Sequence, residues 1–423
     1  MRNSHFFSCN CTPMVRSTLY RRPSMSLDAA PCPFDRVIDR SASNSMKWRA
    51  QERLLTPEQA AADPLPMWVA DMDFRAPQPV IDALIEASQE GVFGYPNGAT
   101  KSYLGAVTDW QARRFGWEVA PEWVVQTSGI ITAIKTIVQG FTSPGDSVLI
   151  QPPVYAHFRD DVLLNGRCPV AAPLNRTETG YRFDAAVFEA AIRPNTRLFI
   201  LSNPHNPTGN VWSAEDLTTM GEICARHDIL VVVDEIHQDL ILNPALRHIP
   251  FASLSEAFAQ NAITCTAPSK TFNVPGLQSA NVFIPNRAIR DQFKRQYDRN
   301  MFALVNVMGM VAAEAAYAHG EPWLEALLAY LRANHAHFAA EINSKTKLQV
   351  LPTQALYLAW MDCRALGLEA EALNDFMLTR ARLWFDKGQK FGTEGHGYMR
   401  VNLGCPRATV NEAIARLLAA LPK

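Results

Sequence analysis

Lys270 is the residue of this sequence that is best suited to covalent chemistry. It follows the apolar segment 263–266, which its β-branched residues predict to be a buried strand, and it stands between Ser269 and Thr271. A lysine beside a buried strand is unfavourable unless its amine is paired, neutral or used covalently. An amine whose pKa shifts readily suits Schiff-base formation with an aldehyde cofactor. The alternative is a lysine that caps a loop and points to solvent.

Asp234 directly follows a second apolar segment, 229–233, which predicts another buried strand. A carboxylate at such a position is unfavourable without a cationic partner. The protonated pyridine nitrogen of a cofactor would be such a partner, and cofactor enzymes use an aspartate in this way. A metal site formed by Asp234, His237 and Asp239 is the alternative, but the sequence offers no second well-spaced set of ligands for it.

Two further polar residues could bind parts of a cofactor or a substrate. Residues 203–209 (Asn-Pro-His-Asn-Pro-Thr-Gly) predict a fixed turn at a strand end, where the amide of Asn206 could donate to a phenolate oxygen. Arg400, in a short predicted strand, could offer two parallel N–H groups to a substrate carboxylate. An ordinary loop and a surface salt bridge are the respective alternatives.

An aromatic residue and a helix start complete the candidates. Tyr155, which follows Gln-Pro-Pro-Val, could stack on a flat cofactor or could be a core aromatic residue. Residues 128–130 (Ser-Gly-Ile) precede a predicted helix and could bind a phosphate through backbone amides. Many helices start after Ser-Gly, so this signal is weak by itself.

Alternating strands and helices must position these residues. The predicted strands of the first part of the chain are 124–127, 147–150, 197–201, 229–233, 263–266 and 281–284. Their alternation with helical patterns predicts an α/β fold with a mostly parallel sheet covered by helices on both faces. The polar residues follow strands, and the binding site of such a sheet lies at the carboxyl ends of its strands.

The second part of the chain predicts a different arrangement. Helical patterns and short strands alternate there: helices 288–298, 303–318, 321–345, 369–382 and 408–421, and strands near 348–352, 357–361 and 399–403. We therefore expect a large cofactor-binding domain over 75–320 and a smaller α+β domain built from 34–74 and 321–423. Residues 1–33 are expected to be a disordered extension; a transit peptide, or translation that begins at Met25, are alternatives.

Composition narrows the class of protein. The chain has 423 residues and a formal net charge of −1, which argues against nucleic acid or an anionic membrane as its main partner. No apolar run approaches the ~20 residues of a membrane span. The eight cysteines are scattered and include no Cys-x-x-Cys pair, which favours reduced thiols and a cytoplasmic location.

Together these residues resemble the pyridoxal-phosphate enzymes of the aspartate-aminotransferase fold (fold type I). More narrowly, they resemble the MalY/PatB-type C–S β-lyases, also called cystathionine β-lyases. The resemblance spans residues 34–421. It is carried by 67–74 (Met-Trp-Val-Ala-Asp-Met-Asp-Phe), 93–95 (Phe-Gly-Tyr), 151–155 (Gln-Pro-Pro-Val-Tyr), 203–207 (Asn-Pro-His-Asn-Pro), 234–237 (Asp-Glu-Ile-His), 267–273 (Ala-Pro-Ser-Lys-Thr-Phe-Asn) and Arg400.

The resemblance implies how the chain would hold pyridoxal 5′-phosphate and a substrate. Lys270 would form the Schiff base, Asp234 would pair with the pyridine nitrogen, and Asn206 would donate to the ring hydroxyl. Tyr155 would stack on the ring, and Arg400 would bind the substrate α-carboxylate. The phosphate would be held by Ser128, Gly129, Ile130, Ser269 and, from the neighbouring subunit, Tyr95.

The resemblance also implies the reaction, α,β-elimination from an S-substituted cysteine such as cystathionine, with a homodimer that shares its active sites. An aminotransferase and a regulatory binding protein of the same fold are the alternatives. His237 is also expected among the cofactor-binding residues, but it lies where aminotransferases commonly have a tyrosine, so its specific role is open. Three positions depart from the family pattern: Ser128 replaces a proline, Arg49 an aspartate, and 354–357 (Gln-Ala-Leu-Tyr) a Gly-Thr-Tyr. These departures bear on substrate preference more than on cofactor binding.

Overall fold

The computed structural model describes residues 32–301 and 305–421. Most of the predicted N-terminal extension (1–31) and the first two residues of the predicted helix 303–318 therefore lie outside the described residues. The described residues from 34 onward form one structural unit, and the elements below belong to it.

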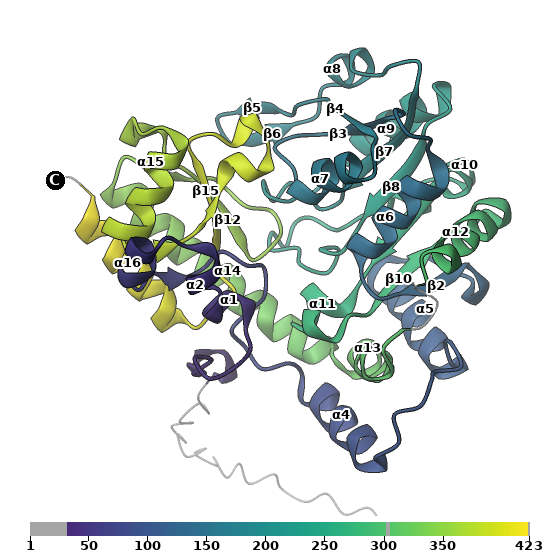
Figure 1. Ribbon diagram of the computed structural model, residues 1–423, viewed down its shortest axis with the longest axis horizontal. Helices are drawn as coiled ribbons and strands as arrows, with labels where there is room; N and C mark the ends of the chain where they lie inside the picture. The colour runs from purple at the N-terminus through teal and green to yellow at the C-terminus, as the bar shows by residue number, and fades with distance from the viewer. Residues whose placement is uncertain (1–31, 302–304, 422–423) are drawn as a thin grey trace, which may run out of the picture. The chain divides into compact units, whose positions relative to one another are not determined.

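A seven-stranded sheet stands at the centre of the described part of this unit, in the strand order β2-β10-β9-β8-β7-β3-β4 (Figure 1). Its strands are β2 (Val124–Thr127), β3 (Ser147–Ile150), β4 (Cys168–Ala171), β7 (Thr196–Ser202), β8 (Leu230–Asp234), β9 (Ala262–Thr266) and β10 (Ala280–Phe283). Only β10 runs antiparallel to its two neighbours; the other pairs are parallel. The predicted α/β class with a mostly parallel sheet is confirmed.

Helices cover both faces of this sheet. In β8, Val232 packs in the apolar cluster that contains α6 (Ile130–Phe141), whereas Val231 and Val233 pack with α9 (Ala214–Arg226). Successive residues of a strand point to opposite faces. A continuous aliphatic run is therefore what a sheet covered on both sides requires.

β4 is the strand of this sheet that the sequence pattern did not predict. It lies at the sheet edge and pairs with β3 alone. Cys168 and Ala171 are exposed, and Pro169 interrupts the run. Proline is tolerated at an edge because one side of the strand needs no hydrogen-bond donors. An edge strand of this kind lacks the apolar run on which the prediction depended.

A second, antiparallel sheet has the order β11-β12-β15-β14. Its strands are β11 (Gln349–Val350), β12 (Leu358–Asp362), β14 (Asp386–Lys387) and β15 (Tyr398–Asn402). The helices α14 (Glu321–Lys345) and α16 (Arg407–Ala420) pack on it through an apolar cluster that includes Phe338, Met361 and Leu417 (Figure 1). The N-terminal arm reaches this region, where β1 (Leu65–Pro66) pairs with β13 (Leu383–Trp384).

The helix predicted over 369–382 is present over 370–380, but its second half is π-helical. The structure has α15 (Ala370–Asp375) followed by a π-helical turn, η6 (Phe376–Arg380). The wider turn buries the adjacent residues Met377 and Leu378 in two different apolar clusters.

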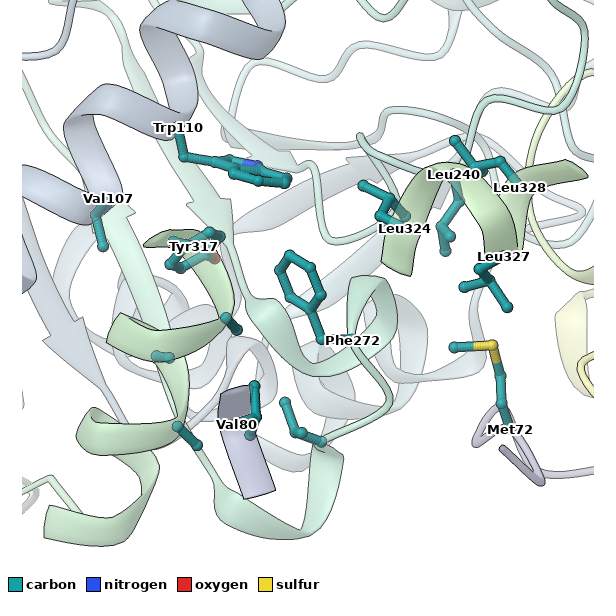
Figure 2. Close-up of a cluster of buried hydrophobic side chains, with 14 of the residues drawn as sticks. Met72, Val80, Val107, Trp110, Leu240, Phe272, Tyr317, Leu324, Leu327 and Leu328 are labelled. Atoms are coloured by element: carbon teal, nitrogen blue, oxygen red, sulfur yellow. The ribbon is translucent and has the colours of Figure 1, made fainter. Parts of the chain in front are cut away.

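Another apolar cluster lies between α4 (Gln78–Glu90), α5 (Lys101–Phe115), α13 (Val307–His319) and α14. Figure 2 shows Phe272 beside Tyr317 and close to Trp110 in this cluster. Phe272 follows α11 (Pro268–Thr271), the short helix that carries Lys270. The other regular elements are α1 (Met46–Arg49), α2 (Gln51–Leu54), α3 (Pro57–Ala61), β5 (Asn175–Thr177), β6 (Gly180–Arg182), α7 (Ala156–Leu164), α8 (Ala185–Ala190), α10 (Glu256–Gln260) and α12 (Arg287–Arg299).

Candidate active site

The strand ends of the central sheet bring most of the predicted site residues to one edge. The register places Ser202 opposite Asp234, and Asp234 opposite Cys265. Because β7, β8 and β9 are parallel, the segments that follow them leave the sheet at the same edge. β2 ends at that edge too, since Thr127 pairs with Ala280 at the start of the antiparallel β10. These segments carry Asn206, His237, Lys270 and Ser128.

The Lys270 amine lies inside this cluster and not in solvent. Its Nζ donates to the carbonyl oxygen of Ala70 over 2.6 Å, and the residue is half-buried. Burial lowers the pKa of Lys270 to about 8, the negative charges of Asp71 and Asp234 oppose this shift, and the positive charge of Arg400 adds to it. An amine with this pKa is partly neutral near pH 8, as a nucleophile or a general base requires.

Two contacts hold the short helix α11 in place beneath Lys270. The hydroxyl of Thr271 donates to Oδ2 of Asp239 over 2.8 Å. Phe272 is fully buried, and its ring centroid lies 5.4 Å from that of Trp110 (Figure 2). Trp110 in turn donates from its indole nitrogen to Asp239 over 3.1 Å. The helix that carries Lys270 is therefore anchored to buried residues of the core.

Asp234 is a buried carboxylate at the end of β8. Burial raises its pKa to about 7, the backbone N–H of Ile236 and the charge of Lys270 act in the opposite direction, and Glu235 adds to the increase. The backbone N–H of Ile236 donates to Oδ1 of Asp234 over 3.1 Å. A cation placed against this carboxylate would restore its ionised form, so the site fits a protonated ring nitrogen.

His237 lies three residues beyond Asp234 and is 3% exposed. Burial lowers its pKa well below the usual range, and the charges of Lys270 and Arg400 add to this effect. The imidazole is therefore neutral, and its Nδ1 has no hydrogen-bond partner within the described residues. Groups of three His, Cys, Asp or Glu side chains suited to a metal ion are absent from residues 32–301 and 305–421.

Arg400 reaches the same cluster from β15 of the smaller sheet. Its guanidinium donates to Oδ1 of Asn206 over 3.1 Å, to the carbonyl of Trp68 over 3.2 Å and to Oδ2 of Asp386 over 2.8 Å. Its Nε is buried and has no partner among the described residues. The guanidinium packs over the ring of Phe391, 4.7 Å from the ring centroid. Arg400 thus keeps unused donor capacity that suits a substrate carboxylate.

The residues predicted to hold a phosphate and a ring also lie near this edge. Gly129 is the N-cap of α6, whose first backbone N–H groups have no partner within the helix. The side chain of Ser128 donates to Thr132 over 3.3 Å, and Ser269 stands beside Lys270 on α11. Tyr155 is half-buried at the start of α7, and burial raises its pKa to about 12. Their roles, and that of Ile130, stay predictions.

Tyr95 is the predicted site residue that does not join this cluster within the chain. It is 91% exposed, on the segment that follows α4, and Phe93 beside it is 65% exposed. Its implied role belongs to a neighbouring subunit, which the exposed position permits.

Sequence reasoning missed the contribution of the N-terminal arm. Asp73 accepts hydrogen bonds from Lys47 over 2.7 Å, Arg40 over 2.8 Å and the Trp48 indole over 2.9 Å. Lys47 is fully buried in this network. These contacts fix the segment whose Ala70 carbonyl receives Lys270. The Asp-Met-Asp sequence and the earlier basic residues could have indicated this network, but no local sequence pattern shows that they pair.

A groove of about 490 Å³ lies outside this cluster and is lined in part by the segment that follows β7. It is lined by Tyr181, Arg182, Asn210, Glu215 and Gln354, among others, and by none of the predicted site residues. The chemistry of the buried cluster, and not the size of the groove, therefore identifies the candidate active site.

Comparison with known proteins places this site within a family. The model of a family described as aminotransferase class I and II matches residues 65–417. Cystathionine beta-lyase PatB of Bacillus subtilis (strain 168) is 42% identical over 392 residues, which cover 92% of this chain and 99% of PatB. Protein MalY of Escherichia coli (strain K12) is 30% identical over 391 residues, with 92% and 98% covered. The crystal structure of the pyridoxal-phosphate-bound C–S lyase from Staphylococcus hominis has a TM-score of 0.85 and 30% identity, with 92% and 98% covered.

The chain belongs to the aminotransferase class I and II family. Within it, the chain is of the MalY/PatB type, as the resemblance of its motifs implied. Proteins of this type are enzymes that use pyridoxal phosphate. The lowered pKa of Lys270 and the buried carboxylate of Asp234 fit that cofactor. None of the described helices is both long and apolar enough to span a membrane.

Proposed function

We propose that this protein catalyses α,β-elimination from S-substituted cysteines such as cystathionine, with pyruvate, ammonia and a thiol as products. The observation that carries this proposal is the similarity to cystathionine beta-lyase PatB over 99% of that protein's length. The cluster of Lys270, Asp234 and Arg400 supports it, because a cofactor lysine, a ring partner and a carboxylate ligand are what amino-acid chemistry on this cofactor requires.

The contacts of these residues support a role for each of them. Bound pyridoxal phosphate supplies an electron sink for the charge that develops at the substrate Cα. Lys270 would hold the cofactor and would remove the Cα proton as a general base. The protonated amine would then donate a hydrogen bond to the Ala70 carbonyl. Arg400 orients the substrate through its α-carboxylate. A bound ring nitrogen would keep Asp234 ionised, and Asn206 would donate its amide to the ring oxygen.

The leaving group separates this reaction from that of an aminotransferase. In elimination the Cβ–S bond breaks, the sulfur takes its bonding electrons, and hydrolysis of the remaining enamine releases pyruvate and ammonia. An aminotransferase instead leaves the Cβ–S bond intact and requires a keto acid to accept the amino group. Both reactions use the same lysine, so only the products discriminate between them.

The test is turnover of L-cystathionine by the full-length, cofactor-loaded protein. Pyruvate and free thiol should appear in equal amounts over many turnovers without an added keto acid. Lys270→Ala, prepared in the same way, is the control and should release neither product. Turnover that stops after one equivalent and resumes with 2-oxoglutarate or pyruvate would replace the lyase with an aminotransferase. Absence of turnover with a range of cysteine conjugates, despite bound cofactor, would favour a binding role.

We also propose a homodimer with shared active sites. The exposed apolar residues Val92, Phe93 and Tyr95 support an interface at the segment after α4, since three such side chains within four residues are unfavourable in water. The proposed domain division, 75–320 against 34–74 with 321–423, follows the two sheets. A cytoplasmic location is supported by the free thiols of the described cysteines.

A further inference from the structure

Two proton donors converge on the carbonyl oxygen of Ala70. Lys270 Nζ lies 2.6 Å from it, and the hydroxyl of Tyr357 lies 2.8 Å from it. A carbonyl oxygen has two lone pairs, so these donors use its full capacity. Tyr357 is 1% exposed, so bulk water cannot replace this hydrogen bond of the phenol.

The backbone beside Tyr357 is held in an unfavourable conformation. Leu356 has φ +76°, in a region that branched side chains rarely adopt. Hydrogen bonds hold it on both sides: the N–H of Leu356 donates to Leu240 over 2.8 Å, and the N–H of Leu403 donates to the carbonyl of Tyr357 over 2.8 Å. Strain that the surroundings maintain in this way is typical of sites where a side chain must point in a defined direction. Here that side chain is the Tyr357 phenol.

We propose that Tyr357 is a positioning residue that acts on Lys270 through the carbonyl group that they share. The inference rests on the proposed function only in taking Lys270 as the cofactor lysine. When Lys270 loses its proton or binds covalently, the Tyr357 hydroxyl keeps the Ala70 carbonyl paired and in place. Because the Ala70 carbonyl already accepts a hydrogen bond from Tyr357, it stabilises the ammonium form of Lys270 less strongly. Deprotonation of the amine therefore becomes easier.

The other groups that face Lys270 act by charge, and Tyr357 does not. Asp71 on the arm and Asp234 at the end of β8 favour the ammonium, whereas Arg400 on β15 opposes it. His237, which interacts with Lys270 and Arg400, is neutral because burial lowers its pKa. Burial and the charge of Asp71 raise the pKa of Tyr357, so its phenol stays protonated and can only donate to Ala70. Removal of the hydroxyl therefore changes Lys270 through the hydrogen bond alone.

The test is the pKa of Lys270 in the full chain freed of cofactor, compared between wild type and Tyr357→Phe. Competitive labelling with fluorodinitrobenzene over a range of pH, read by mass spectrometry, reports the Lys270 amine, and exposed Lys294 serves as the internal reference. Loss of one hydrogen bond to the shared carbonyl should raise the Lys270 midpoint by about half a pKa unit. The acidic limb of the kcat profile of the loaded enzyme should move in the same direction. Because labelling does not involve turnover, its result does not depend on which reaction the enzyme catalyses.

Two further variants make the test specific. Tyr398→Phe removes a buried phenol that stacks on Trp360, outside the cluster, and should leave the Lys270 midpoint unchanged. Replacement of Tyr357 with 3-fluorotyrosine keeps the shape but makes the phenol a stronger donor, so the midpoint should fall. A midpoint that is unchanged or lower in Tyr357→Phe, or that does not fall with 3-fluorotyrosine, would overturn the proposal.

Discussion

Arg400 donates a hydrogen bond from Nη1 to Oδ1 of Asn206 over 3.1 Å, although 194 residues separate the two in sequence. The bond joins a strand of the smaller sheet to the segment that follows β7 of the central sheet. It occupies the amide oxygen of Asn206 and leaves the amide nitrogen to donate elsewhere, as the proposed contact with the cofactor ring requires. In their proposed roles, Arg400 and Asn206 would couple substrate binding to cofactor binding through this bond.

Arg400→Lys should impair substrate binding more than turnover. Lysine keeps the charge but loses the planar fork that can bind a carboxylate and Asn206 together. We expect kcat/KM for cystathionine to fall by about 100-fold, mostly through KM, as the loss of charge-assisted hydrogen bonds predicts. Arg287→Lys is the control, since the Arg287 side chain is 88% exposed. A fall below threefold would remove Arg400 from the substrate site.

Lys270→Ala should abolish the covalent link to pyridoxal phosphate. After treatment with borohydride and dialysis, wild type should retain a cofactor mass on the peptide that contains residue 270, and the variant should not. Turnover should fall by several orders of magnitude, because the variant lacks both the nucleophile and the base. The exposed Lys294→Ala should behave as wild type. Retention of the covalent cofactor by Lys270→Ala would assign the lysine elsewhere.

The buried carboxyl of Asp234 should make the stability of the cofactor-free protein depend on pH. Its pKa is raised to about 7 in the folded chain, against about 3.9 when unfolded. A raised pKa stabilises the fold below pH ~4, and this contribution is lost as pH rises to about 7. Asp234→Asn should therefore gain about 2–4 kcal/mol relative to wild type between pH 4 and pH 8, measured by urea unfolding without cofactor.

The control for this pH dependence is Asp109→Asn, because Asp109 is exposed on α5. It should follow wild type at every pH. With pyridoxal phosphate present, the order at pH 8 should reverse, because the ring nitrogen would pair with Asp234 of the wild type only. If cofactor-free wild type and cofactor-free Asp234→Asn showed the same pH dependence, this would contradict an Asp234 carboxyl that titrates near neutrality.

Phe272→Ala should destabilise the support of Lys270. Phe272 is fully buried between Trp110 and Tyr317, so truncation leaves a cavity in the cluster of Figure 2. Such truncations lower the free energy of unfolding by about 3–5 kcal/mol. Leu164→Ala, at a side chain that is 76% exposed, should change it by less than about 0.5 kcal/mol. A loss below about 1 kcal/mol for Phe272→Ala would mean that the cluster does not anchor α11.

Tyr95→Phe and Lys270→Ala should complement each other if the active sites are shared. In a mixed dimer, one site would carry both substitutions and the other neither, because Tyr95 would serve the neighbouring subunit. Refolded mixtures should then show up to about a quarter of wild-type activity at equal ratios, half of the dimers being mixed and each having one intact site. Activity equal to the average of the two unmixed variants would argue against a shared site.

The sequence by itself determined the elements and the chemical groups that they carry. Continuous aliphatic runs such as 229–233 predict strands buried on both faces, because each residue meets a covered face whichever way it points. The residues after those runs, Asp234 and Lys270 among them, were recognised because a charged group at a buried strand end is unfavourable unless it has a binding partner. These signals are local, so no knowledge of the chain path was needed.

The tertiary structure alone decided which distant groups meet these residues. The Ala70 carbonyl, 200 residues before Lys270, Tyr357 beside it and Asp386 against Arg400 have no sequence signature. A backbone carbonyl is present at every position, so its selection depends on how the arm crosses the sheet edge. The proton affinity of Lys270 is set by burial and by the charges that this path brings together, because electrostatic and hydrogen-bond interactions depend on distance in space and not on separation along the chain.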